Sequence, residues 1–576
     1  MQLAQRLPVE LIALTRATCY ARPLSTSARR FTAPPAADSR VFVTTPIFYC
    51  NADPHIGHLH STLLADVYGR FSRLRNPLAP PPVVCTGTDE HGLKIQRVAE
   101  ERGMTPQELC DGVSPRFKDL ADAANVGYTH FIRTTEERHK RAVDHIWREL
   151  NSRGFIYKSS YAGWYAVSDE AYYTRAQVME VVDPKTGEKH FASIESGSRV
   201  EWMEEDNYKF RLSAFRERLI EWLSSSPNPL QPSSRTTALL ASLSPADVSE
   251  PTDLADLSIS RPSARLTWGI PVPDDPDHTI YVWIDALVNY LTVAGYPWKG
   301  GEAYVEGQVW PPDLMIVGKD IIRFHALYLP AVLMALDLPL PKHLLAHGHW
   351  TMDKFKMSKS RGNVANPFEA MKLWGTDAMR MYLMRAGGNS AADADYSATE
   401  IEAFYKKSLA GQMGNLLSRI SNKKLIEQLS SPAAIYTAPT VVEPEDERLV
   451  ELLTALPTTF DEHMATFDVH RALASVFDVL AEANRHIQLL APWLADASPS
   501  SMHRSLFYES ETLRITGILL QPFMPEKSKQ LLDTLGVSEE RRGWPDLGLG
   551  EGGERTMMKG KLKQLFPNVK LEEVKA

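Results

Sequence analysis

The sequence predicts an α/β protein in which a parallel sheet covered by helices is interrupted by an inserted domain and followed by an all-helical domain. Strand-like and helical runs alternate over residues 41–154 and again over residues 276–395, which is typical of such a sheet. Residues 155–275 have a different texture, rich in aromatic and polar side chains. After residue 395, apolar residues recur at three- and four-residue steps, as in residues 467–494, which indicates amphipathic helices.

Length and composition limit the classes of protein to consider. The chain has 576 residues, of which 44% are hydrophobic and 23% charged, and this length suits about three or four domains. No apolar run approaches the roughly 18 residues of a membrane span. The net charge of −8 argues against a general basic coat for nucleic acid, so any RNA contact needs a local patch. The four cysteines form no C-x-x-C pair, so the sequence encodes neither a disulfide framework nor a cysteine zinc knuckle.

Residues 1–40 have the composition of a mitochondrial transit peptide. They contain six arginines, no lysine and only two acidic residues, together with many serines and threonines. Leucines at helical spacing near the start complete the pattern. A disordered tail is the alternative. We therefore exclude this segment from the expected fold, which begins at residue 41.

The first half of the sheet region, residues 41–154, opens with a buried strand over residues 41–49 and continues into the stretch DPHIGHLHSTLLADV, residues 53–67. The stretch predicts a helix that begins among His55, Gly57 and His58. A helix start offers unpaired N–H groups and a partial positive charge, which together bind phosphate. Histidines there can donate hydrogen bonds to phosphate oxygens. Taken alone, the motif fits a satisfied turn or a chance metal-like cluster equally well.

The inserted region, residues 155–275, contains strand-like pieces at 161–167 and 178–183. The Ser/Pro-rich residues 224–234 are expected to form a surface loop. The alternation of strand-like and helical runs then resumes at residues 279–291 and 312–336.

A charged loop, DKFKMSKSRGN at residues 353–363, follows near the end of the second half of the sheet region, residues 276–395. Its basic side chains are Lys354, Lys356, Lys359 and Arg361. Such a loop can fold over a polyphosphate and stabilise negative charge that develops in a transition state. The alternative is a solvated basic loop.

HIGH at residues 55–58 and KMSKS at residues 356–360 are the paired pattern of class I aminoacyl-tRNA synthetases. Further segments occur in the order found in the methionyl enzymes of the bacterial and organellar kind: VTTPIFYCNADPHIGH, TGTDEHG, FIRTTEERHK, DLSISRP, WGIPVP, YVWIDALVNY, IVGKDIIRFH and KMSKSRGN. The chain thus resembles the methionyl-tRNA synthetases from about residue 41 to 530. The resemblance implies a Rossmann-type catalytic domain in two halves, 41–154 and 276–395, a connective domain at 155–275, and a helical-bundle anticodon-binding domain with a tail at 396–576.

The activity implied is that of a methionine–tRNA ligase. ATP, arriving with Mg²⁺ on its phosphates, converts methionine to methionyl-adenylate, and the methionyl group then passes to the 3′ end of tRNA(Met). By resemblance, His55, Gly57, His58 and Asp320 bind ATP, and Lys356 and Lys359 meet the pyrophosphate. The catalytic residues would be His55, His58, Lys356 and Lys359. Because the methionine carboxylate itself attacks the α-phosphorus, positioning and charge stabilisation carry the rate.

The positions that match the methionine site in the family are Ile47, Tyr49, Asp89, Trp283, Ala286, Leu287, Tyr290 and His325. Asp89 can pair with the ammonium group of the substrate. Aromatic rings suit a thioether, at about 0.3–1.5 kcal/mol for each sulfur–aromatic contact. Without the resemblance, Trp283 and Tyr290 would be assigned to an apolar core, and His325 would be a satisfied core histidine.

The positions that match the anticodon contacts of the family are Asn415, Arg419 and Trp493. A tryptophan can stack on an unpaired base while Asn and Arg bind base edges. The alternative for Trp493, which follows a proline at a helix boundary, is a plug in the helical core.

Many members of the family carry a zinc knuckle in the connective domain, but Ala166 and Asp169 stand where its first two cysteines would be. No structural zinc and no other protein-bound metal is therefore expected, and aromatic residues would hold the insertion instead: Trp164, Tyr165, Tyr172 and Tyr173. The partners implied are methionine, ATP and tRNA(Met), with no membrane, in a monomer of the mitochondrial matrix. Two rivals remain: a nucleotidyltransferase of another pathway with an H-x-G-H loop, and a catalytically silent RNA-binding descendant.

Overall fold

A computed structural model describes most of the chain beyond residue 39. The described residues are 40–166, 171–173, 175–182, 187–194, 196–243, 254–298, 309–352, 354–356, 365–388, 391–422, 425, 427, 437–552 and 564–569. The transit-peptide prediction falls, except for Arg40, outside these residues.

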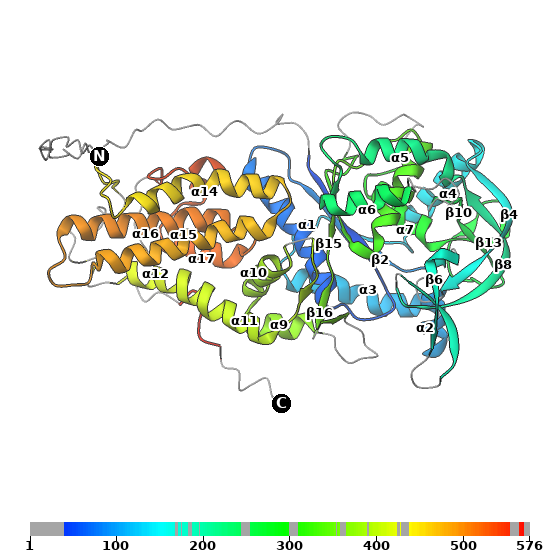
Figure 1. Cartoon of the computed structure of the whole chain (residues 1–576), viewed down its shortest axis with the longest axis horizontal. Coiled ribbons are helices and arrows are strands. Elements are labelled where there is room, and N and C mark those ends of the chain that lie inside the picture. Colours follow the sequence, from blue (N-terminus) through cyan, green and yellow to red (C-terminus); the bar gives the residue numbers. More distant parts are fainter. Residues whose placement is uncertain are drawn as a thin grey trace, which may run out of the picture.

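A six-stranded parallel sheet forms the centre of the molecule (Figure 1). Its strands, in spatial order, are β3 (His130–Arg133), β2 (Val83–Asp89), β1 (Phe42–Tyr49), β14 (Leu314–Gly318), β15 (Leu344–His347) and β9 (Leu230–Gln231). All five pairings are parallel. From β1 the chain proceeds outward to β2 and β3, and it later proceeds in the other direction from β14 to β15. The strand order therefore reverses between β1 and β14, and ligands bind at the carboxyl ends of the strands beside such a point.

Side chains of the central strands alternate between two apolar cores, as expected for a sheet with helices on both faces. Val43, Val84 and Ile316 belong to one core, whereas Phe42 and Val317 belong to the other. The helices that contribute to the first core are α1 (Ile56–Arg75), α3 (Pro106–Ala123), α9 (Pro367–Trp374) and α10 (Thr376–Gly387). Those of the second core are α4 (Glu137–Ser152), α5 (Arg216–Leu223), α6 (Ser233–Leu243), α7 (Val282–Val293) and α8 (Leu329–Ala335). Helix α2 (Leu93–Glu101) follows β2 and packs with α3.

Part of the region predicted to be an insertion packs with the central sheet. The surface loop predicted at residues 224–234 is wrong at Leu230–Gln231, which form β9 and pair with β15 at the edge of the central sheet. Helices α5 and α6, on either side of β9, place apolar side chains such as Leu219 and Leu239 in the second core. The later part of the predicted 155–275 insertion therefore packs with the central sheet. The sequence did not indicate β9, because a two-residue strand is too short to show a periodicity.

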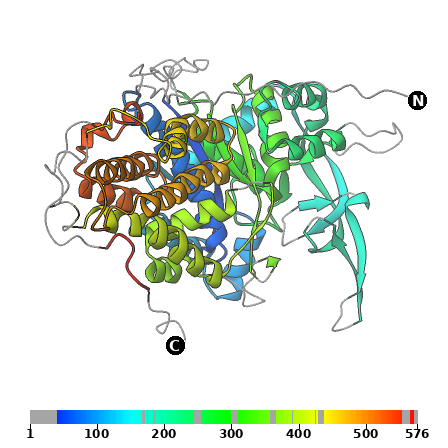
Figure 2. The ribbon, with the colours of Figure 1, turned by 60° about the vertical axis from the view of Figure 1, so that its left-hand side comes forward.

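The inserted strands form a separate antiparallel sheet that extends away from the central sheet (Figure 2). Its strands are β4 (Ile156–Ala166), β5 (Ala171–Tyr173), β6 (Val178–Val182), β7 (Lys189–Ser193) and β8 (Arg199–Phe210), with β10 (Leu257–Ser258) paired to β8. The rings of Trp164 and Phe191 lie 4.4 Å apart, and those of Tyr165 and Tyr172 lie 4.8 Å apart. The guanidinium of Arg261 lies over both tyrosines, at 5.3 and 4.8 Å. Aromatic packing therefore organises this sheet.

Ala166 ends β4, and Asp169 lies outside the described residues. Within the described part of the chain, no three His, Cys, Asp or Glu residues are grouped so that they could hold a metal ion. Two small sheets complete the β structure: one of β11 (Ser260–Pro262), β12 (Pro271–Val272) and β13 (Asp275–Ile280), and one of β16 (Trp350–Met352), β17 (Phe355–Lys356) and β18 (Ala394–Asp395).

The C-terminal region is a helical bundle that packs on α1 and α10 (Figure 1). Its helices are α11 (Ala398–Phe404), a π-helical segment (Tyr405–Gly414), α12 (Asn415–Ile420), α14 (Glu447–Ala465), α15 (Val469–Leu490), α16 (Pro499–Leu519) and α17 (Pro525–Thr534). The first core runs without interruption from Leu63 of α1 through Met379 of α10 to Leu473 of α15. Among the helices that the structure describes, none is long and apolar enough to span a membrane.

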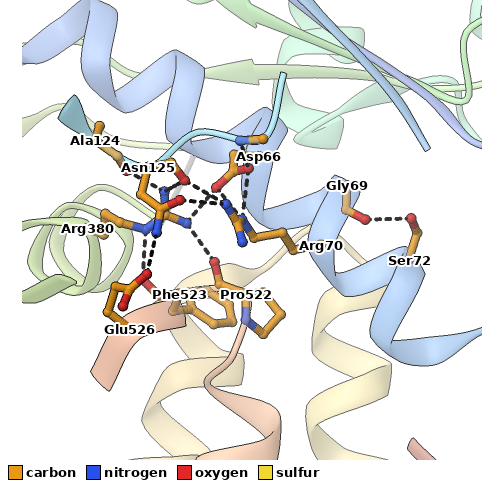
Figure 3. Close-up of polar contacts among 11 residues, drawn as sticks. Asp66, Gly69, Arg70, Ser72, Ala124, Asn125, Arg380, Pro522, Phe523 and Glu526 are labelled. Atoms are coloured by element: carbon orange, nitrogen blue, oxygen red, sulfur yellow. Dashed lines mark hydrogen bonds and ion pairs between the residues drawn. The ribbon is translucent and has the colours of Figure 1, made fainter. Parts of the chain in front are cut away.

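A buried arginine joins the bundle to the helices that cover the central sheet (Figure 3). Arg380 of α10, 1% exposed, donates from Nη2 to Asp66 Oδ2 of α1 at 2.6 Å and to the Pro522 carbonyl at 2.8 Å. Its Nε donates to the Phe523 carbonyl at 3.1 Å, and its Nη1 to the Ala124 carbonyl at 2.9 Å. One guanidinium therefore connects α1, the end of α3 and the corner between α16 and α17.

Candidate active site

A cavity of about 310 Å³ opens at the carboxyl ends of β1, β2, β14 and β15. Twelve of the residues predicted to bind ATP or methionine line it: Ile47, Tyr49, His55, Gly57, His58, Asp89, Trp283, Ala286, Leu287, Tyr290, Asp320 and His325. They come from segments up to 278 residues apart, between Ile47 and His325, and they meet where the strand order reverses.

The two histidines of the H-x-G-H stretch cap helix α1 with their side chains. His55 is the N-cap residue, and its Nδ1 accepts from the Gly57 N–H at 3.1 Å. The Nδ1 of His58 accepts from the His55 N–H, also at 3.1 Å. Because each Nδ1 accepts a backbone N–H, a neutral ring carries its proton on Nε2. Both rings, stacked 3.8 Å apart, therefore present an N–H donor at the positive end of α1.

Gly57 is required because the backbone and the His55 ring approach closely. A Cβ atom at this position would lie 2.9 Å from His55 Cε1 and 3.1 Å from His55 Nδ1. Any larger residue would displace the ring that caps the helix. Glycine thus maintains the geometry of His55.

The end of β15 and the segment after it supply cavity residues that sequence reasoning missed: His347, Gly348, His349 and Trp350. His349 Nε2 lies 3.1 Å from Asp320 Oδ1, and the His349 N–H donates to Asp393 Oδ1 at 2.9 Å. Asp393 also pairs with Lys319 at 2.8 Å. These contacts fix the ends of β14 and β15 beside each other. The sequence could have indicated these residues, because the polar stretch HGHW lies at the end of a buried strand.

The buried acidic group of the cavity is Asp89 at the end of β2, which is 5% exposed, whereas the side chain of Asp320 is 51% exposed. Tyr49, at the end of β1, donates its hydroxyl to the His91 carbonyl at 2.9 Å. A carboxylate at low exposure pairs well with a substrate ammonium group, because water competes little there.

His325 and Tyr290 form a buried pair on the opposite wall. His325 Nδ1 lies 2.9 Å from the Ile321 carbonyl, so it is the protonated nitrogen, and its Nε2 accepts from the Tyr290 hydroxyl at 2.7 Å. Burial lowers the pKa of His325 to about 4, so the ring is neutral at physiological pH. The wall offers polarisable but uncharged groups, which suit a thioether.

The indole of Trp283 stacks on Phe324 with centroids 3.5 Å apart and planes inclined by 16°. Phe324 lies on the π-helical segment Phe324–Tyr328, one residue before His325. Sequence reasoning missed this phenylalanine, because in an apolar stretch it is indistinguishable from a core residue.

The base of the KMSKS loop is a short hairpin of β16 and β17, in which Thr351 pairs with Lys356. Lys354 adopts φ +63°, and its N–H donates to Asp395 Oδ1 at 2.9 Å. Lys356 lies in β17, at the end of this hairpin. Lys359 and Arg361 lie outside the described residues.

The three residues predicted to contact the anticodon lie on the helical bundle. Asn415 and Arg419 are one turn apart on α12, and the Arg419 guanidinium lies 5.5 Å from the ring centre of Trp493. With its amide oxygen toward Arg419, Gln488 accepts from Nη1 at 2.6 Å and from Nη2 at 2.7 Å. Trp493 is 47% exposed, so it is not the core plug considered as an alternative. A hollow of about 530 Å³ adjoins Asn415, between α12 and residues 564–568.

Comparison with known proteins agrees with this geometry. Residues 41–421 match the family described as tRNA synthetases class I (M), and residues 438–561 match the anticodon binding domain of methionyl tRNA ligase. Over 533 residues the chain is 44% identical to the probable mitochondrial methionine–tRNA ligase of Neurospora crassa, covering 90% of this chain and 83% of that protein. Over 526 residues it is 42% identical to the human mitochondrial methionine–tRNA ligase, covering 89% and 86%.

The fold resembles solved structures as well. The methionyl-tRNA synthetase of Mycobacterium tuberculosis in complex with methionyl-adenylate superposes with a TM-score of 0.81 at 33% identity. The match covers 92% of this chain and all (100%) of that one. Its apo form gives a TM-score of 0.74 at 30% identity, with 92% and 98% covered.

Proposed function

Because the chain belongs to the class I methionyl-tRNA synthetases, we propose a residue-level assignment for the two steps that such an enzyme catalyses. The enzyme, of the mitochondrial type, activates methionine with ATP to methionyl-adenylate and transfers the methionyl group to tRNA(Met). The observation that supports the assignment is the cavity at the carboxyl ends of the parallel strands, because it is lined both by the start of helix α1 and by aromatic side chains beside the buried carboxylate of Asp89.

ATP, as its Mg²⁺ complex, lies over the start of α1 in this assignment. The Nε2–H groups of His55 and His58 donate to its phosphates, and Asp320, at the end of β14, contacts the ribose side of the nucleotide. The helix start and the two imidazoles bind the triphosphate without a dedicated metal cage, since Mg²⁺ is held mainly by the phosphates themselves.

Methionine occupies the part of the cavity between β1, β2 and α7. Asp89 pairs with its ammonium group, Trp283 and Leu287 contact the side chain, and the neutral Tyr290–His325 pair faces the sulfur. This orientation leaves the carboxylate of methionine directed toward the helix start of α1, where the α-phosphate lies. Its attack forms the acyl–phosphate bond and expels pyrophosphate, with no covalent help from the protein.

Lys356 and Lys359 stabilise the charge that develops on the departing pyrophosphate. Lys356 belongs to the hairpin anchored by Asp395, and two residues of chain separate it from Lys359, which suits a basic strap over the phosphates. A lysine in this role acts in the transition state more than in the ground state.

The second step uses the helical bundle to select the tRNA. In the assignment, Trp493 stacks on an unpaired anticodon base while Asn415 and Arg419 bind base edges, with Arg419 held by Gln488. The enzyme works in the mitochondrial matrix as a monomer. The catalytic, inserted and anticodon-binding regions follow one another along the chain. We assign residues from about 211 to 243 to the catalytic region, because they pack on the central sheet or pair with it.

The test is methionine-dependent ATP–pyrophosphate exchange, followed by charging of a mitochondrial tRNA with a CAU anticodon. A silent RNA-binding descendant would give no exchange, and a nucleotidyltransferase of another pathway would not require methionine. Lys359→Ala should slow activation far more than it weakens methionine binding. Equal effects on kcat and on methionine affinity would remove the transition-state role assigned to this lysine.

A further inference from the structure

A buried carboxylate lies directly behind the proposed methionine pocket, on the face of α7 that is turned away from the cavity. Asp285 is fully buried, with 0% of its surface exposed, and it does not line the cavity. Its helix neighbours Trp283, Ala286 and Leu287 do. A buried charge is costly unless it is paired and hydrogen-bonded, so we examine the groups that surround Asp285.

Two histidines from different segments flank this carboxylate. His91 Nδ1 lies 2.6 Å from Asp285 Oδ2, and His139 Nε2 lies 2.7 Å from Oδ1. His91 follows β2, two residues after Asp89, whereas His139 belongs to α4. His139 Nδ1 in turn lies 3.0 Å from the hydroxyl of Thr292, again on α7. Both oxygens of Asp285 are thus used, and each bond joins α7 to a different part of the fold.

The carboxylate is ionised despite its burial. Burial alone would raise the pKa of Asp285, but the charge and hydrogen bonds of His91 and His139 lower it to about 2. Each imidazole must therefore donate an N–H to the anion, which gives charge-assisted bonds in a water-free environment.

The same contacts reach both walls of the pocket. The His91 carbonyl accepts the Tyr49 hydroxyl, and Tyr49 lines the cavity next to Asp89. The anion of Asp285 therefore connects the wall made by Tyr49 and Asp89 to the wall made by Trp283 and Leu287. Between the two walls lies the space assigned to the methionine side chain and its ammonium group.

We propose that Asp285, through His91 and His139, is a positioning residue that sets the width of the methionine pocket and so its fit to the length of the substrate side chain. It does not touch the substrate. This inference rests on the proposed placement of methionine in the cavity.

The strength of the expected effect follows from how tightly such pockets discriminate. One methylene group changes binding by about 10- to 200-fold in a fitted apolar pocket. A pocket wall that moves by about the length of one methylene group should therefore change methionine binding to a similar extent. Asp285→Ala removes both bonds and should raise the methionine KM by about tenfold, while the ATP KM stays within about twofold. Asp285→Asn keeps the shape, and its amide can accept from His91 and donate to His139, so it should have a smaller effect.

A matched control exists in the helical bundle. Asp446 is also fully buried and also paired with a histidine, since its Oδ1 lies 2.9 Å from His486 Nε2. Asp446→Ala and Asp446→Asn alter the same chemistry far from the cavity. They should lower the thermal unfolding midpoint as the Asp285 variants do, but leave the methionine KM unchanged.

The experiment measures ATP–pyrophosphate exchange with methionine, with ATP and with ethionine as the varied substrate, for the full-length enzyme and the four variants. The inference expects a higher methionine KM and a smaller preference for methionine over ethionine only in the Asp285 variants, with Asn between wild type and Ala. The inference is overturned if Asp285→Ala and Asp446→Ala have the same effect on the methionine KM and on the preference for methionine over ethionine. It is also overturned if Asp285→Ala lowers kcat but changes neither the methionine KM nor that preference.

A cavity-lining variant separates this inference from the proposed function. Trp283→Ala should raise the methionine KM whether or not Asp285 positions the pocket. If Trp283→Ala does so and both Asp285 variants do not, the positioning role is refuted while the methionine site stands. If neither position affects the methionine KM, the placement of methionine in this cavity is refuted as well.

Discussion

Replacing Arg380 by methionine should be among the most destabilising single changes in this protein. The guanidinium is 1% exposed and donates to the carboxylate of Asp66 and to the backbone carbonyls of Ala124, Pro522 and Phe523. It makes a longer contact, of 3.4 Å, with the Asn125 carbonyl, which also accepts from Arg70 at 2.6 Å and so keeps a partner when Arg380 is replaced. A thioether of similar length fills the space but donates nothing. Three buried acceptors and one buried anion would lose a partner at once.

The magnitude follows from these contacts. A buried polar group left without a partner costs about 1–3 kcal/mol. At the lower bound, the three carbonyls contribute about 3 kcal/mol. Asp66 keeps the Gly127 N–H at 2.7 Å and Arg70 at 2.9 Å, so its loss is limited to about 1–2 kcal/mol. The expected total is about 4–5 kcal/mol, which agrees with the range for breaking a buried ion pair.

The assay is urea-induced unfolding monitored by tryptophan fluorescence. The urea midpoints of the variants are compared with that of the wild type, provided that the m-value is unchanged. Arg70→Met is the matched control, because Arg70 pairs with the same Asp66 but has a side chain that is 29% exposed, and it should cost about 1 kcal/mol. Arg380→Lys should recover little, since an ammonium cannot direct donors to four separate acceptors in one plane. A loss below about 1 kcal/mol for Arg380→Met, or equal losses for Arg380→Met and Arg70→Met, would refute the reasoning.

Three further changes test other parts of the structure. Gly57→Ala places a Cβ 2.9 Å from His55 Cε1 and should raise the ATP KM in pyrophosphate exchange more than the methionine KM; equal increases would contradict the role given to His55. The pKa of His325 is lowered from 6.5 to about 4 in the fold, so between these values the unfolded chain binds more protons. Stability from this site is therefore complete above about pH 6.5 and falls as the pH decreases toward 4, and unfolding midpoints of wild type and His325→Gln should converge in that window. Trp493→Ala should cost about 1–3 kcal/mol in kcat/KM for tRNA charging and leave ATP–pyrophosphate exchange unchanged; a parallel loss in exchange would show that the tryptophan supports the fold instead.

The sequence was sufficient for the fold class and for most of the candidate site. The patterns of residues 41–49 and 53–67 identified strand β1 and helix α1, and the family motifs selected residues as distant as Tyr49 and His325 that the structure brings to one cavity. The motifs located the site because they lie at the carboxyl ends of strands and at helix starts, which is where parallel sheets bind their ligands.

What the sequence did not indicate are interactions that depend on tertiary packing. Arg380 and Asp285 are charged residues in largely apolar helices, and nothing in the local sequence shows which distant groups they meet. Strand β9 has two residues and no periodicity, so only its pairing with β15 identifies it. Phe324 is one apolar residue among many, and its stack on Trp283 requires the π-helical turn that presents it.

The continuity of the first core has a consequence for how such a protein can be rearranged. Leu63 of α1, Met379 of α10 and Leu473 of α15 are buried in one cluster, so the chain position near residue 395 separates two regions of sequence but not two independent folding units. A fragment ending there would leave the apolar faces of α1 and α10 in water and would aggregate. Exchange of the tRNA-reading module between members of this family therefore has to carry the matching surface of the nucleotide-binding half with it.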